Sequence, residues 1–286
     1  MAFAIGAVLN IALVAAQIFA GIAGGSMALI ADAVHNLGDV LGLLMAWLAA
    51  VLGARGPSHG RTYGWGRGSI LAALANAMIL LISSGAIAIE AVQRLMAPMP
   101  VAGGLVMAVA AAGIVVNGLT AVLFMRGQED LNIRATFLHM AGDAAVSGGV
   151  LVGALVIGLT GWLWVDPLLS LVIVAVIVWG SWGILRQAAH LAIDGVPPRL
   201  RRDAVHDYLA GLAGVSEVHD LHIWALSTTQ VALTAHLVRD EATDDQALIG
   251  AACAGLFERF RIDHATLQVE TPALAATCRL RPEEVI

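Results

Sequence analysis

Four ionisable side chains stand as two matched pairs within apolar segments of the 286-residue chain. His35 and Asp39 lie in ADAVHNLGDVLGLL, and His139 and Asp143 repeat the same H-x-x-x-D spacing in FLHMAGDAAVSGG. Residues four apart share one helix face, with side chains about 6 Å apart. Two imidazole nitrogens and two carboxylates suit a tetrahedral divalent ion, above all Zn2+. The repeated spacing therefore predicts a metal site built by these four residues.

Each pair alone has a second interpretation, because intramembrane polar side chains also hydrogen-bond neighbouring helices. Ionisable groups in hydrocarbon cost roughly 2.5–3.5 kcal/mol each on insertion scales, and they usually mark a pathway or a site. Two matched pairs favour the metal site. If the two segments pack antiparallel, His35 faces Asp143 and Asp39 faces His139. For Asp32, on the same stripe as His35, two interpretations stay open: a functional role in relaying protons or orienting a ligand, and a structural hydrogen bond to a neighbouring helix.

The elements that must hold these residues are membrane helices. The chain is 59% hydrophobic and only 13% charged, whereas soluble domains are about half apolar and a quarter charged. A spanning helix needs about 20 apolar residues, and six segments qualify: 2–24, 27–53, 69–93, 101–125, 133–160 and 163–189. Met1 is followed directly by apolar residues, without the basic region that begins a signal peptide, so we interpret the first segment as a span. His35 lies nine residues into its segment, which predicts a site near the middle of the bilayer.

Arginine placement predicts the orientation. Most loop arginines lie on one side of the six spans, at positions 55, 61, 67, 126, 134, 186 and 199, whereas only Arg94 lies on the other side. Basic residues concentrate in cytoplasmic loops. We therefore expect an integral membrane protein of the plasma or inner membrane with both termini in the cytoplasm.

The charge distribution predicts a second domain. Residues 191–286 hold fourteen of the 21 acidic residues, and the change falls at the Gly- and Pro-containing stretch 194–198. We expect a transport domain over 1–194 and a cytoplasmic domain over 195–286. In the latter, periodicity predicts the order αββαβ: a helix over 199–213, strands over 215–226 and 229–239, a helix over 244–261 and a strand over 265–270. Cys253 and Cys278 lack metal-type spacing, so they argue neither for a disulfide framework nor for a cysteine metal site. The net charge of -6 gives no reason to expect nucleic acid.

Beyond these patterns, the sequence resembles the cation diffusion facilitator family over nearly its whole length. The resemblance rests on the two H-x-x-x-D pairs and on three further stretches: TYGWGRGSILAALANA at 62–77, VHDLHIWALS at 218–227 and HATLQVE at 264–270. The resemblance implies an α-helical membrane protein with six transmembrane helices and a small ferredoxin-like α/β cytoplasmic domain. It also implies a homodimer that exports divalent metal in exchange for protons. His and Asp in both motifs resemble the zinc-type branch.

The resemblance also implies further metal ligands. Cytoplasmic sites of relatives use positions that match His219, His236, His264 and Glu270, and period two puts His264 and Glu270 on one strand face. A structural role at the dimer interface stays open for these residues, while His206 and His222 are expected to be structural. The chain departs from many relatives in lacking a His-rich loop in RGQEDLN. In the loop 54–67 only His59 remains as a candidate, and we expect it to be solvated.

The predicted function is a secondary transporter that exports Zn2+, together with Cd2+, Co2+ or Ni2+, with Zn2+ as substrate and as a candidate regulatory ion but with no cofactor. Two other functions stay open: an intramembrane zinc enzyme and a membrane metal sensor. The enzyme would need an open coordination position and a general base, usually from H-E-x-x-H, which the sequence lacks. The sensor would not need a metal site shared by two separate spans. We therefore predict a transporter and not an enzyme.

Overall fold

The computed structural model describes residues 2–53, 55–123 and 131–281. The chain forms two compact units, one of Met1–Met45 with Ala75–Leu185 and the other of Ala46–Leu74 with Arg186–Ile286. The ends of three long helices thus belong to the second unit. The predicted boundary between residues 194 and 195 stays a prediction, since the units do not divide the sequence at one point.

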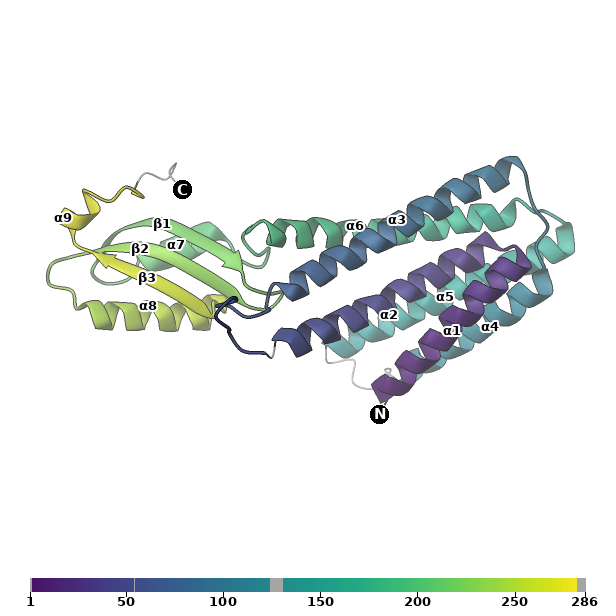
Figure 1. The fold of residues 1–286 in the computed structure, drawn as a ribbon, viewed down its shortest axis with the longest axis horizontal. Coiled ribbons are helices and arrows are strands. Elements are labelled where there is room, and N and C mark those ends of the chain that lie inside the picture. Colours follow the sequence, from purple (N-terminus) through teal and green to yellow (C-terminus); the bar gives the residue numbers. More distant parts are fainter. Residues whose placement is uncertain (1, 54, 124–130, 282–286) are drawn as a thin grey trace. The chain divides into compact units, whose positions relative to one another are not determined.

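Six long helices correspond to the six predicted spans. Their bounds are α1 Ala2–Gly24, α2 Met27–Gly53, α3 Gly68–Met96, α4 Gly103–Leu123, α5 Leu131–Thr160 and α6 Val165–Ala192 (Figure 1). Among the described residues, five of these helices, α2 to α6, are long and apolar enough to cross a membrane, and a shorter apolar stretch of α1 covers Leu9–Gly24. The expected α-helical membrane protein is confirmed.

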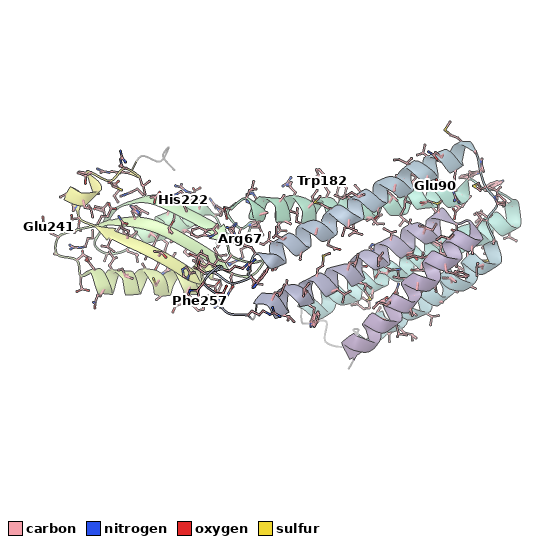
Figure 2. The ribbon with its side chains drawn as sticks, in the orientation of Figure 1. Arg67, Glu90, Trp182, His222, Glu241 and Phe257 are labelled. Atoms are coloured by element: carbon pink, nitrogen blue, oxygen red, sulfur yellow. The ribbon has the colours of Figure 1, made fainter. Side chains whose placement is uncertain are left out.

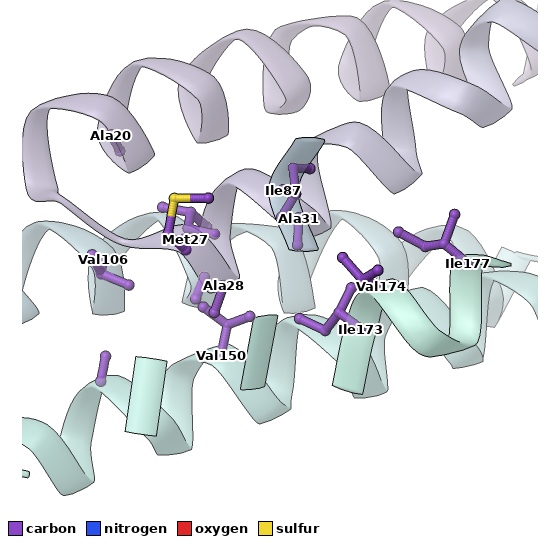
Figure 3. Packing of buried hydrophobic residues seen from close by; sticks show 13 residues of the cluster. Ala20, Met27, Ala28, Ala31, Ile87, Val106, Val150, Ile173, Val174 and Ile177 are labelled. Carbon is purple, nitrogen blue, oxygen red and sulfur yellow. The ribbon is translucent and has the colours of Figure 1, made fainter. Parts of the chain in front are cut away.

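The first unit has one buried core to which all six helices contribute. Its buried side chains are mostly small or β-branched: Ala20, Met27, Ala28, Leu29, Ala31, Ile87, Val106, Ala110, Val150, Ala154, Ile173, Val174 and Ile177 (Figure 3). Small residues allow helix backbones to approach closely, which is how helices associate in lipid. The core thus places polar groups of several helices within reach of one another.

The outer surface of these helices is also apolar. Phe19 is 71% exposed and Trp179 is 87% exposed, and Trp182 projects from α6 (Figure 2). Large apolar side chains at such exposure would be unfavourable in water over so many positions, but they match a lipid environment. The exposed surface supports the interpretation of these helices as spans.

In the second unit, the order αββαβ is confirmed. The elements are α7 Arg202–Ala210, β1 Val215–Ala225, β2 Val231–Arg239, α8 Asp245–Phe260 and β3 His264–Glu270, followed by the short helix α9 Pro272–Ala275, which was not predicted. The sheet order is β1-β2-β3, with β1 antiparallel and β3 parallel to β2. A parallel pair needs a crossover, and α8 supplies it.

The two faces of this sheet have different roles. Leu233 and Leu237 of β2 pack with Leu209 of α7 and Leu256 of α8 in a shared apolar core. Because side chains alternate along a strand, His236 points to the opposite face. Its direct neighbours across the sheet are His219 of β1 and Gln268 of β3. The face away from the helices therefore carries the imidazoles.

Candidate metal centre

The four membrane residues predicted as ligands lie together between α2 and α5. His35 Nε2 lies 3.1 Å from Asp143 Oδ1, and His139 Nε2 lies 3.4 Å from Asp39 Oδ2 and 3.8 Å from Asp143 Oδ2. The rings of His35 and His139 have centroids 6.2 Å apart. The pairing expected for antiparallel helices is thus present, and each helix supplies one imidazole and one carboxylate.

The geometry of these groups suits a small ion better than a closed hydrogen-bond network. One ligand atom each of His35, Asp39 and Asp143 lies within 4.8 Å of the others. Asp39 Oδ2 is buried, and apart from the ion-pair contact with His139 Nε2 at 3.4 Å it has no hydrogen-bond partner within the described ranges. Asp143 is 3% exposed, whereas the His139 side chain is 44% exposed. Carboxylates this close repel one another unless a cation or protons compensate them.

Asp32 belongs to a separate polar network one turn away. Its Oδ2 accepts hydrogen bonds from Gln17 Nε2 of α1 at 2.7 Å and from Ser147 Oγ of α5 at 2.9 Å. Asn36 Nδ2 in turn donates to Gln17 Oε1 at 3.0 Å. Of the two interpretations left open for Asp32, the structural one therefore has direct geometric support. The network ties α1 and α5 to α2 beside the metal ligands.

A second group of possible ligands lies in the tail. Single ligand atoms of His219, His236, Glu270 and Cys278 all lie within 4.8 Å of one another. His236 Nδ1 is 2.9 Å from Glu270 Oε1, and His219 Nε2 is 3.5 Å from Glu270 Oε2. Three of the four residues predicted from the resemblance are therefore close together.

The fourth predicted tail ligand lies elsewhere. His264 pairs with Ala232 at the opposite end of β3 from Glu270, and six residue-to-residue steps along the strand separate the two by about 20 Å. Its exposed ring contacts Tyr63 edge-on, with centroids 5.3 Å apart. Period two correctly placed the residues on one face, but it says nothing of distance along the strand. Within this chain, His264 does not join the other three.

The remaining histidines take no part in either group. His59 is exposed in the loop after α2, as expected, where Arg61 stacks over the Trp65 ring at 3.8 Å. His222 is held by Asp220, whose Oδ1 lies 2.9 Å from His222 Nε2. His206 lies beside Asp207 on α7, with 3.6 Å between Nδ1 and Oδ1.

Sequence reasoning missed two residues that matter here. Asp166 of α6 caps the start of α2, because Ser26 Oγ and the Met27 amide both donate to its carboxylate. Its signal was an acidic residue in the first turn of a span. The spacing of Cys278 gave no argument for a metal site, and its contact with His236, which is 42 positions away, follows no local pattern.

Comparison with known families covers nearly the whole chain. The family model for the cation efflux transmembrane domain matches residues 3–191. The model for the cation efflux protein cytoplasmic domain matches residues 197–272. The two matches meet near the change in charge composition.

Several characterised proteins are similar to the chain. Zinc transporter ZitB of Escherichia coli strain K12 is 35% identical over 268 residues, which are 92% of this chain and 85% of that protein. A cadmium, cobalt and zinc/H(+)-K(+) antiporter of Bacillus subtilis is 32% identical over 262 residues, which are 88% and 83%. Among solved structures, the metal-bound C-terminal domain of the CzcD transporter from Cupriavidus metallidurans is 33% identical and covers 25% of this chain and 99% of that one, with a TM-score of 0.24.

Proposed function

The chain belongs to the cation efflux family of membrane transporters, and from this premise we propose that it exports Zn2+ from the cytoplasm in exchange for protons. The meeting of His35, Asp39, His139 and Asp143 between two spans carries this proposal. Similar proteins are named as a zinc transporter and as a cadmium, cobalt and zinc antiporter of H+ and K+. On that basis we propose Zn2+ as the substrate of this chain and protons as the ions exchanged for it.

Charge balance supports the exchange. Two carboxylates and one Zn2+ sum to zero, which makes the loaded site tolerable in a medium of low dielectric constant. Without metal, the same neutrality requires a proton on each of His35 and His139. A ligating imidazole must be neutral, so metal and protons compete for the same nitrogens. We therefore propose that one Zn2+ exchanges for up to two protons.

Transport requires that this site open alternately to the two sides. Rocking of helices around a fixed site near the membrane midplane is the general arrangement in such carriers. The partial exposure of His139 beside the buried Asp143 supports an access route along one edge of the group. The arginine bias supports cytoplasmic termini, and the tail domain supports a homodimer.

Metal flux measured in vesicles tests the proposal. Purified protein reconstituted with a pH gradient should move Zn2+, and a panel with Cd2+, Co2+, Ni2+ and Mn2+ would define selectivity. Asp39→Ala and Asp143→Ala should each lower the Zn2+ rate by more than the roughly 10–100-fold that loss of an outer-shell partner costs. Glu90→Ala is the control, since this carboxylate of α3 pairs with Arg94 and lies outside the group.

Each alternative has its own outcome in this assay. Zn2+ binding without flux would indicate a metal sensor. Flux that is independent of the pH gradient would contradict proton exchange while leaving zinc export in place. Near wild-type rates in Asp39→Ala or Asp143→Ala would reject the four-ligand site itself.

A further inference from the structure

The sheet face that carries the tail imidazoles is covered by the segment after β3. Thr271 Oγ1 accepts from the Leu274 amide at 3.3 Å and so begins α9, with Pro272 in its first turn. Ala275 is 1% exposed against the sheet. The Cys278 amide then donates to the Ala275 carbonyl at 3.1 Å. This turn brings the Cys278 thiol to His236, with 3.7 Å between Sγ and Nδ1.

Beneath this segment lie polar groups that need a ligand. His219 is 5% exposed, yet neither of its ring nitrogens has a hydrogen-bond partner within the part of the chain that the structure describes. Glu270 is 1% exposed, and its Oε2 is likewise unpartnered among those residues. A buried polar group without a partner destabilises the fold, and a charged one does so more strongly. A bound cation would satisfy both side chains together.

We propose that Cys278 completes a four-ligand zinc site with His219, His236 and Glu270 inside a single tail domain. Zinc bonds of about 2.0–2.3 Å put the ligand atoms of a tetrahedral site about 3.3–3.6 Å apart. The observed separations bracket these values, with 2.9 Å and 3.5 Å between imidazole and carboxylate atoms and 3.7 Å between imidazole and thiol. The ligands need only small side-chain shifts to enclose the ion.

The second nitrogen of each imidazole faces a carboxylate, as is usual for zinc-bound histidines. His236 Nε2 lies 3.5 Å from Asp220 Oδ2, and His219 Nδ1 lies 3.6 Å from Glu217 Oε1. Asp220 reaches this position because the register of β1 shifts between His219 and His222, where Asp220 has a φ of 51°. Such bulges redirect side chains. Shortening these two contacts to hydrogen-bond distance would orient the other nitrogen of each ring toward the proposed ion.

A thiolate ligand has two consequences. Glu270 and Cys278 as anions neutralise one Zn2+, and the soft sulfur favours Zn2+ or Cd2+ over Mn2+ or Mg2+. The metal would also fasten the C-terminal segment to the sheet. Apart from that bond, Arg281 holds the segment through two hydrogen bonds to Glu217, at 2.9 Å and 2.7 Å. The site thus reaches beyond transport, since it makes the fold of the C-terminus depend on metal.

Cobalt spectroscopy on the full-length protein tests the thiolate. The membrane site is first disabled with Asp39→Ala and Asp143→Ala, so that the tail site is read alone. With Co2+ as probe, this protein and its Cys253→Ser derivative should both show the near-ultraviolet charge-transfer band of a Co2+–thiolate bond. Cys278→Ser should lose the band. A band that survives Cys278→Ser would overturn the proposal. So would a band that is absent from both proteins that keep Cys278.

Thiol protection gives a second, independent readout. In the same Cys253→Ser derivative, whose membrane site is disabled, Cys278 is the one remaining thiol of the sequence. One equivalent of Zn2+ should slow its alkylation by iodoacetamide at least tenfold, and a chelator should restore the rate. His236→Ala should abolish this protection, whereas His264→Ala should retain it. Alkylation unaffected by Zn2+, or protection lost only in His264→Ala, would contradict the ligand set.

Discussion

His35 Nε2 lies 3.1 Å from Asp143 Oδ1, although 108 positions of sequence separate the two residues. This contact joins two of the proposed ligands directly. A Zn2+ ion bound by both groups would replace it, so that an imidazole–carboxylate pair gives way to two metal bonds. The identity of the residue at position 35 should therefore influence both the affinity and the choice of ion.

Replacing His35 by Asp is expected to broaden metal selectivity. A carboxylate accepts more coordination geometries than an imidazole, which should admit the larger Cd2+, and oxygen ligands suit Mn2+ better than a nitrogen does. In the vesicle assay, the ratio of Cd2+ or Mn2+ flux to Zn2+ flux should rise roughly tenfold, equivalent to about 1.4 kcal/mol. His59→Asp in the exposed loop serves as control and should leave the ratio unchanged. If the flux ratios of His35→Asp match those of the wild type, selectivity would depend on helix packing and not on this ligand.

Removing the cap of α2 is expected to reduce stability without touching the metal site. Asp166 is 4% exposed and accepts hydrogen bonds from Ser26 Oγ and, at 2.6 Å, from the Met27 amide. Ser26 Oγ in turn accepts from the Leu29 amide at 3.1 Å as the N-cap of α2, and leaving a buried donor such as the Met27 amide without its acceptor costs about 1–3 kcal/mol. Asp166→Ala should therefore lower the unfolding midpoint in detergent, and Asp166→Asn, which keeps an acceptor, should recover most of it. Zn2+ affinity per folded molecule should match the wild type; a specific loss of affinity would mean that Asp166 acts in transport.

A methyl group at position 113 is expected to disturb the network around Asp32. A Cβ on Gly113 would lie 2.8 Å from Ser147 Oγ, whose hydroxyl donates to Asp32 at 2.9 Å. Gly113→Ala must displace this side chain and should lower the thermal midpoint. Gly118 lies on the same helix with open space around it, so Gly118→Ala should gain up to about 1 kcal/mol from helix propensity. Equal effects at both positions would show that Ser147 relocates without loss.

The sequence predicted those parts of the structure that depend on local periodicity. Apolar runs gave the six spans, and the i, i+4 spacing gave the faces of His35 with Asp39 and of His139 with Asp143. Antiparallel packing of two spans then predicted which His meets which Asp. The prediction succeeded because every step used a regular helix, in which residue number determines position.

Contacts that depend on irregular backbone were not predicted. Cys278 reaches its site through a short helix and a turn, and Asp220 reaches His236 through a register shift. Neither the turn nor the register shift leaves a periodic pattern in the sequence. His264 fell on the predicted face but at the wrong end of the strand, because alternation defines a side and not a distance. Tertiary placement of loops therefore decided which tail residues meet.

The clasp between Glu217 and Arg281 is expected to open in acid. The hydrogen bonds from Arg281, with a smaller contribution from nearby His219, lower the pKa of Glu217 below its ordinary value of 4.5. A carboxyl whose pKa is lower in the folded state stabilises the fold above its ordinary pKa, and this contribution is lost as pH falls through the lowered value. The clasp should hold the C-terminal segment fully at pH 7 and release it as the pH falls below about 4.5.

Hydrogen exchange of residues 271–281, measured without metal and divided by the intrinsic exchange rate at each pH, reports this release. In the wild type, the protection of these amides should fall on acidification. Arg281→Ala should show the low protection already at pH 7, with little further change in acid, whereas Arg279→Ala should behave like the wild type. High protection in Arg281→Ala at pH 7 would mean that α9 packing alone holds the segment.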